Sequence, residues 1–138
     1  MEAEKKIKKI SYLESLNART VFDENCIIQV SFALIADKWT LLTLTTLMQG
    51  TKRNSDLQKQ VVGISPKMLS QTLKALLKYG MISRKVYPEV PPRVEYTLTE
   101  FGASLVEPLS GFYNWSVDWE DKLRAVYKKT KGKNELLI

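Results

Sequence analysis

The chain has 138 residues, of which 44% are hydrophobic and 26% are charged, with a net charge of +6, and this composition predicts one globular domain with a buried core. It contains no histidine and one cysteine, Cys26, which excludes histidine-based catalysis, metal sites rich in these residues and a disulfide within the chain. No apolar stretch approaches the roughly 18 residues of a membrane span and the charged N-terminus lacks a signal-peptide core, so we expect a cytoplasmic protein with no membrane partner.

Two helices are predicted in the N-terminal part of the chain. Residues 4–18 carry apolar side chains three positions apart, and the narrowness of this stripe favours a packing arm, within residues 1–22, over a helix on a membrane surface. Asp23 and Asn25 can cap the next helix. We expect this second helix to belong to the core through Ile27, Val30, Leu34 and Ile35.

A third helix is predicted from Lys38 to Met48. Asp37 can accept a hydrogen bond at its start, and Gly50 ends it. This helix is also expected to form the core, through Leu42, Leu44 and Leu47. Trp39 is interpreted as a packing anchor rather than as a platform for a ligand.

Two helices joined by a short turn are predicted next. Ser55 begins a short helix that ends near Gln60. After the turn, Ser65 and Pro66 mark a second helix, because serine caps helix ends and proline tolerates the first helical position. The second helix ends at Gly80, and the apolar side chains that share one of its faces are Leu69, Leu73, Leu76 and Leu77.

A β-hairpin and a final helix complete the predicted elements. The strands are Ile82–Tyr87 and Arg93–Leu98, and the connector PEVPP should form a stiff exposed tip. Thr99 can cap a last helix over residues 100–130, in which Pro108 marks either a kink or a late start. Its apolar stripe, with nearly heptad spacing, consists of Leu105, Leu109, Phe112, Trp119, Leu123 and Val126. The order of elements predicts a mainly α-helical fold with a small β-hairpin, a winged helix-turn-helix.

The net positive charge lies between Gly50 and Thr99. This region holds nine basic and three acidic residues, a net charge of +6, while the flanking segments together hold twelve of each. A localised positive field favours a polyanionic partner. The alternative is a solvated surface rich in lysine.

One face of the helix after Pro66 carries polar side chains suited to reading DNA. In a helix-turn-helix, the second helix enters the major groove. Lysine binds guanine acceptors or phosphate, and glutamine can form two hydrogen bonds with adenine. The alternative is an ordinary amphipathic surface helix. The side chains on this face, opposite the leucines, are Lys67, Ser70, Gln71, Lys74 and Lys78.

The hairpin adds cations around its rigid tip, namely Arg84, Lys85 and Arg93. An arginine that projects from such a tip can enter a minor groove, where the electrostatic potential is most negative. We predict this role for Arg93. The alternative is that Arg93 pairs with Glu89 or Glu95.

Three motifs resemble those of a known family. They are Cys26 with DKWTLLTL at 37–44, GISPKMLSQTLKAL at 63–76 and YPEVPPRVEYTLTEFG at 87–102. Through them, residues 25–120 are similar to the HxlR-type transcriptional regulators, a branch of the MarR-like winged helix-turn-helix proteins. The chain departs from the usual family pattern at Asn54, where an aromatic residue is common.

The resemblance implies a single DNA-binding domain over residues 1–138 with no enzymatic activity, and we expect no cofactor. It implies a homodimer, held by the N-terminal arm at 1–22 and the C-terminal helix at 100–130. The helix-turn-helix and wing, at 50–99, would bind a pseudo-palindromic operator, and we expect repression. The residues expected to contact double-stranded DNA are Arg53, Ser55, Ser65, Lys67, Met68, Ser70, Gln71, Lys74, Lys85 and Arg93.

Cys26 is expected in the first turn of its helix, where the positive end of the helix dipole favours a thiolate. Some members of the family use the matching cysteine to sense electrophiles, quinones or oxidants. With one cysteine per chain, the available reactions are alkylation, a mixed disulfide, or a bond between the cysteines of two subunits. The alternative is a small buried packing residue. The sequence also leaves open whether a small-molecule effector binds.

Two other classes of function compete with DNA binding. A winged helix that has lost DNA binding could dock proteins instead, although such a module would not need the basic face. An enzyme would need a nucleophile next to a base, and no spacing in the sequence assembles one.

Overall fold

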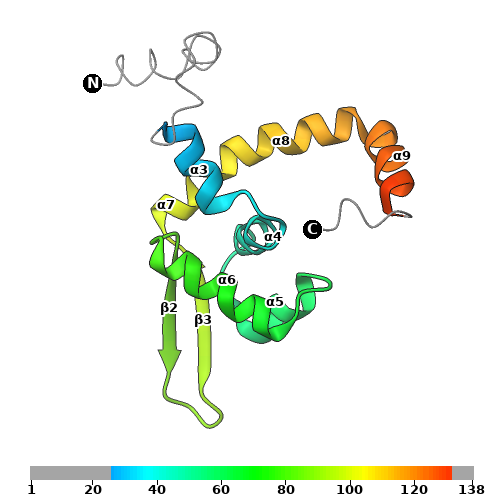
Figure 1. Cartoon of the computed structure of the whole chain (residues 1–138). Helices are drawn as coiled ribbons and strands as arrows, with labels where there is room; N and C mark the ends of the chain where they lie inside the picture. Colours follow the sequence, from blue (N-terminus) through cyan, green and yellow to red (C-terminus); the bar gives the residue numbers. More distant parts are fainter. Residues whose placement is uncertain (1–25, 132–138) are drawn as a thin grey trace.

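The computed structural model describes residues 26–131 and arranges them as shown in Figure 1. The helices are α3 (Ile27–Ile35), α4 (Lys38–Leu47), α5 (Asn54–Gln60), α6 (Pro66–Lys78), α7 (Glu100–Ala103), α8 (Val106–Asp118) and α9 (Glu120–Lys131). The strands are β1 (Lys52–Arg53), β2 (Ile82–Tyr87) and β3 (Arg93–Leu98). The predicted arm at 1–22, its helix at 4–18, and the capping residues Asp23 and Asn25 lie outside the described residues.

The strands form one antiparallel sheet in the order β1–β3–β2. Both hairpin strands have the predicted bounds, and their register pairs Ile82 with Leu98. The sequence does not predict β1, because two residues are too few to show the alternation of a strand. Since β1 places Arg53 opposite Glu95, it ties the start of α5 to the hairpin.

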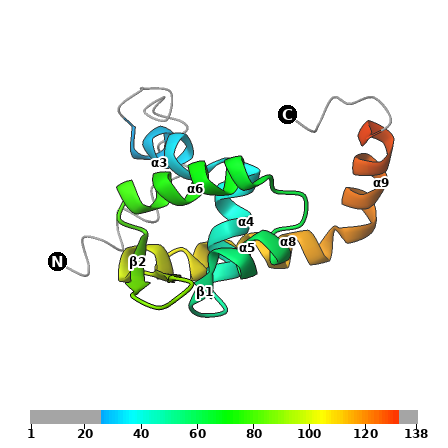
Figure 2. The same cartoon turned by 90° about the horizontal axis from the view of Figure 1, so that it is seen from below.

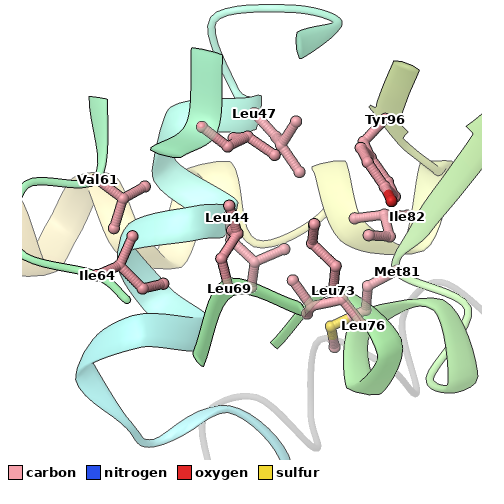
Figure 3. Packing of buried hydrophobic residues seen from close by; sticks show 11 residues of the cluster. Leu44, Leu47, Val61, Ile64, Leu69, Leu73, Leu76, Met81, Ile82 and Tyr96 are labelled. Carbon is pink, nitrogen blue, oxygen red and sulfur yellow. The ribbon is translucent and has the colours of Figure 1, made fainter. Parts of the chain in front are cut away.

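The core lies between α4, α5, α6 and the sheet (Figure 3). Burial of each large aliphatic side chain here contributes about 1.5–3 kcal/mol to the free energy of folding. Trp39 packs against this core as an anchor, in agreement with the prediction. The buried hydrophobic side chains are Leu44, Leu47, Leu57, Val61, Ile64, Leu69, Leu73, Leu76, Met81, Ile82 and Tyr96.

Side-chain caps fix the starts of α4 and α6 as predicted. Asp37 Oδ1 accepts a hydrogen bond from the backbone N–H of Thr40 over 3.0 Å. Ser65 Oγ accepts one from the backbone N–H of Met68, also over 3.0 Å. Each such cap contributes about 1 kcal/mol. Gly80 follows the end of α6 with a φ of 73°, a left-handed conformation that favours glycine.

The last helix predicted over residues 100–130 is wrong as one element, because three helices occupy this segment. Thr99 caps the short α7, where its Oγ1 accepts from the N–H of Gly102 over 3.2 Å. The long helix α8 starts late, at Val106, so Pro108 lies in a first turn whose N–H groups have no intrahelical partner. Trp119, with φ −111° and ψ 22°, ends α8 and interrupts the apolar stripe before α9.

Helix α3 is not the core element that its hydrophobicity predicts. None of its residues is buried, and Ile27 is 73% exposed. Only its C-terminal end, at Ile35, packs against the core. The apolar pattern predicts burial without identifying the partner, and within residues 26–131 no segment covers the outer side of this helix.

None of the helices in residues 26–131 has by itself both the length and the apolar composition to cross a membrane. Helices α3 and α4 have that length and apolar composition only when they are taken together, and the chain bends by 81° between them.

Candidate nucleic-acid interface

Helix α6 divides its side chains between the core and solvent. Its leucines at 69, 73 and 76 are buried, while the polar side chains on the other face are exposed. Because the apolar face is fixed in the core, the backbone also fixes the direction of the polar face. Met68, a predicted DNA contact, is half-buried and packs against the core at the border between the two faces. The exposed set consists of Lys67, Ser70, Gln71, Lys74 and Lys78.

The cations of α6 are free of carboxylate partners. Within residues 26–131 the salt bridges are those of Arg93 and Arg124, so the α6 lysines keep their full charge available for a ligand. In the same part of the chain, no group of three or more cysteine, aspartate or glutamate side chains could hold a metal ion.

The start of α5 brings two further predicted contacts next to the wing tip. The helix begins at Asn54, one residue earlier than predicted, and the N–H of Arg53 donates to Asp56 Oδ2 over 3.1 Å. Arg53 and Ser55 are both exposed. With the residues from Glu89 to Val94 they line a cavity of about 390 Å³.

The wing arginine that was predicted to reach DNA is held by its neighbours. Arg93 Nη2 lies 3.4 Å from Glu89 Oε1, and its Nε lies 3.3 Å from Glu95 Oε1. Its guanidinium carbon also lies 4.0 Å from the ring centroid of Tyr87. The ion pairing that the sequence leaves as the alternative is therefore present, while the role of Arg93 on DNA stays a prediction.

The second wing cation lies close to this cluster. Lys85 is exposed and lies opposite Glu95 in the register of the two strands. Its Nζ lies 4.9 Å from the centroid of the Tyr87 ring. Arg84 was not among the predicted contacts, yet it lines a groove of about 200 Å³ with Ser70 and Lys74. Strand alternation is the signal that could have found Arg84, because it lies two positions after the buried Ile82.

Cys26 occupies the N-cap position of α3, one residue before the first turn in which it was predicted. Its thiol is half-exposed and caps no backbone N–H of the helix. Its carbonyl accepts a hydrogen bond from the N–H of Val30 over 3.1 Å. Within the described chain this cysteine is therefore not the fully buried packing residue of the alternative interpretation.

A family model of HxlR-like helix-turn-helix proteins matches residues 34–124. Among curated relatives, the helix-turn-helix transcriptional regulator YtfH of Escherichia coli K12 is 36% identical over 109 residues, which cover 79% of this chain and 86% of YtfH. The match spans α4 through α8, so it includes the whole surface described above.

Solved structures show the same fold. One from Porphyromonas gingivalis W83, assigned to the MarR family of transcriptional regulators, matches with a TM-score of 0.66 and 39% identity over 69% of this chain and 93% of its own. The transcriptional regulator YodB of Bacillus subtilis in its reduced form matches with a TM-score of 0.59 and 35% identity, over 64% of this chain and 86% of its own. The structure of diamide-treated YodB matches with a TM-score of 0.57 and 34% identity, over 66% of this chain and 90% of its own.

These similar proteins all carry names of transcriptional regulators. Three observations indicate the same family. The family model matches residues 34–124, α5, α6, β2 and β3 have a winged arrangement, and the basic face of α6 is exposed. The chain therefore belongs to the family of HxlR-like helix-turn-helix proteins and is a transcriptional regulator with a helix-turn-helix DNA-binding domain.

Proposed function

We propose that this regulator binds a specific double-stranded operator through α6 and represses transcription by covering a promoter. The observation that carries the proposal is the exposed polar face of α6, where Lys67, Gln71 and Lys74 have no carboxylate partner in the described part of the chain. Because the opposite face is fixed in the core, α6 can present these side chains to a major groove without rearrangement.

The predicted contacts divide into two kinds. Gln71 can pair with adenine, and Lys67 can donate to guanine acceptors, so these two would read bases. Arg53, Ser55 and Ser65 lie at or before helix starts and suit backbone phosphates, which position a protein without specifying sequence. The first N–H groups of α6 can add to phosphate binding, because they have no partners within the helix.

We infer that the regulator acts as a homodimer. Helices α8 and α9 bury no side chain within the described chain, and the end of α8 and α9 project away from the body in both views (Figure 1, Figure 2). Exposed aromatic residues of this density are typical of a subunit interface. A twofold dimer would place two copies of α6 on successive major grooves, about 34 Å apart. The large exposed apolar side chains of α8, α9 and the residue between them are Val106, Phe112, Tyr113, Trp115, Val117, Trp119, Val126 and Tyr127.

We further propose that Cys26 couples DNA binding to thiol oxidation. The thiol is half-exposed at the start of α3, and the similar regulator YodB has been solved in reduced and diamide-treated forms. The reaction joins the thiols of two subunits, and diamide accepts their two electrons and two protons to become a hydrazine. A disulfide between subunits would change the spacing of the two reading helices.

Since promoters lie with the genome, we infer that the protein works in the cytoplasm.

A titration of labelled DNA against salt tests DNA binding directly. The affinity for the regulator's own upstream region should exceed that for random DNA of equal length, and it should fall steeply as salt rises. A flat salt dependence, or equal affinity for both DNAs, contradicts the proposal.

Charge reversal separates DNA binding from a role in protein docking. Lys67→Glu with Lys74→Glu should abolish operator binding, because both residues lie on the exposed face of α6. The double variant should keep its dimeric mass, because neither residue lies on α8 or α9. Unchanged DNA binding in this variant would leave protein docking as the better interpretation.

A further inference from the structure

The groove between α6 and the wing contains two cations that come from opposite walls. Lys74 and Ser70 lie on the α6 wall, and Arg84 of β2 lies on the other. The groove has a volume of about 200 Å³, several times the roughly 30 Å³ of one water molecule. No carboxylate is among the residues that line it, which also include Asn54, Leu73, Leu77 and Tyr96.

Strand register explains why Arg84, and not its neighbour Lys85, faces this groove. Arg84 is paired with Tyr96, and Tyr96 is buried against the core, so both point to the face of the sheet that packs on α6. Successive residues of a strand point to opposite faces. Lys85 therefore lies on the other face with Glu95, Tyr87 and Arg93.

The two faces of the wing differ in their free charge. On the outer face, the two cations Lys85 and Arg93 lie beside two carboxylates, Glu89 and Glu95, although only Arg93 forms ion pairs with them within residues 26–131. On the inner face, neither Arg84 nor Lys74 has an ion pair within residues 26–131. The cations and carboxylates of the outer face therefore balance, whereas the groove beside α6 contains two cations and no carboxylate.

The groove combines the kinds of donor that bind a phosphodiester. Its walls supply a guanidinium and an ammonium, and arginine can bind two phosphate oxygens at once. The hydroxyl of Ser70 and the amide of Asn54 add neutral donors. The apolar floor of Leu73, Leu77 and Tyr96 excludes water on one side, which strengthens the attraction between charges.

We propose that Arg84 and Lys74 clamp one backbone phosphate of the operator between the wing and α6. The inference rests on the proposed function and adds a positioning residue, Arg84, to it. A phosphate held between the two elements would set the depth and register of α6 in the major groove, so that Gln71 meets the intended base. This clamp would contact every DNA sequence alike.

The test compares three variants that each remove one positive charge from an exposed position: Arg84→Gln, Lys85→Gln and Lys128→Gln. Arg84→Gln should weaken binding to operator and random DNA by a similar factor of about 10, and it should reduce the slope of log affinity against log salt by about 1. Lys85→Gln should cost less, and Lys128→Gln on α9 serves as the distant control. A loss for Arg84→Gln no larger than that for Lys128→Gln overturns the clamp.

Neutral methylphosphonate linkages, placed one at a time along the operator, identify the phosphate. At the clamped position, wild-type affinity should fall and Arg84→Gln should add no further loss, because both changes remove the same contact. An additive loss at every position overturns the proposal. Unfolding curves of Arg84→Gln should match those of the wild type, since Arg84 is exposed.

A last experiment distinguishes a DNA phosphate from a free anion as the ligand of the groove. DNA-free protein is titrated with inorganic phosphate against chloride at equal ionic strength and followed by NMR. Saturable shifts confined to the groove, with normal DNA binding by Arg84→Gln, would reassign the groove to a free anion and overturn the clamp. If the wild type binds no DNA in a salt-dependent way, the proposed function fails as well; if it binds and Arg84→Gln binds equally, only the clamp fails.

Discussion

The guanidinium of Arg93 lies over the ring of Tyr87, with its central carbon 4.0 Å from the ring centroid. The same side chain lies within 3.4 Å of Glu89 and 3.3 Å of Glu95, and only 29% of it is exposed. These contacts connect the two strands of the wing just below its tip. They hold in place the arginine that the sequence predicts as a minor-groove probe.

The first prediction therefore concerns Arg93. We expect Arg93→Gln to lower the free energy of unfolding by about 1 kcal/mol, through the lost ring contact and ion pairs, and to change operator affinity by less than Arg84→Gln does. Urea unfolding and fluorescence anisotropy measure the two effects. A tenfold loss of affinity with unchanged stability would show instead that Arg93 leaves its carboxylates and enters DNA.

A second prediction concerns the contact between α7 and the turn after α6. A Cβ atom added at Gly102 would lie 2.1 Å from the carbonyl oxygen of Met81, a backbone atom that also accepts from the N–H of Thr99 over 3.0 Å. Because neither backbone can move freely, Gly102→Ala should lower the free energy of unfolding by about 2–3 kcal/mol.

Gly111 provides the matched control for this substitution. A Cβ at Gly111, inside α8, would meet no atom within 4 Å. Gly111→Ala should stabilise the protein by about 0.5–1 kcal/mol, because alanine loses less backbone entropy in a helix. Similar unfolding curves for the two variants would contradict the close packing of α7.

A third prediction concerns base reading by Gln71. Gln71→Ala should reduce discrimination at a single base position by about 1–3 kcal/mol and leave the salt slope unchanged, because the amide carries no charge. Binding to a set of operators with every single-base change, measured for both proteins, locates that position. A uniform loss over all operators would mean that Gln71 contacts the DNA backbone.

A fourth prediction concerns the subunit interface. Trp115 is 48% exposed and lies outside the core, so Trp115→Glu should leave a folded monomer while its charge prevents burial between subunits. Sedimentation should show half the dimeric mass, and operator affinity should fall because the second reading helix is lost. Thr45→Glu places the same charge on the exposed side of α4 and should remain dimeric.

A fifth prediction concerns Cys26. Diamide should change the operator affinity of the wild type. It should also produce a disulfide-linked dimer on non-reducing gels, which dithiothreitol reduces to monomers. Cys26→Ser should bind DNA as the reduced wild type does and should not respond. A full diamide response in Cys26→Ser rules out the thiol mechanism, because the chain has no other cysteine.

The reading helix was predictable because its signals are local. A capping serine, a proline in the first position and leucines at helical spacing together fix the start of α6 and its buried face. The bounds of β2 and β3 followed from alternation and from the proline-rich connector. The break at Trp119 was not predictable in this way, since the stripe from Leu105 to Val126 continues through it.

The amino-acid sequence by itself determined which face of α6 is buried, where the hairpin begins and ends, and where the net charge lies. These properties depend on side chains within one or two turns or strand lengths of each other. Tertiary structure alone decided that Arg84 faces Lys74 while Arg93 faces Glu89 and Glu95, and that no residue of α3 is buried by the rest of residues 26–131. Such choices depend on the pairing of segments that are distant in the chain, and a one-residue change of strand register would exchange the two faces of the wing.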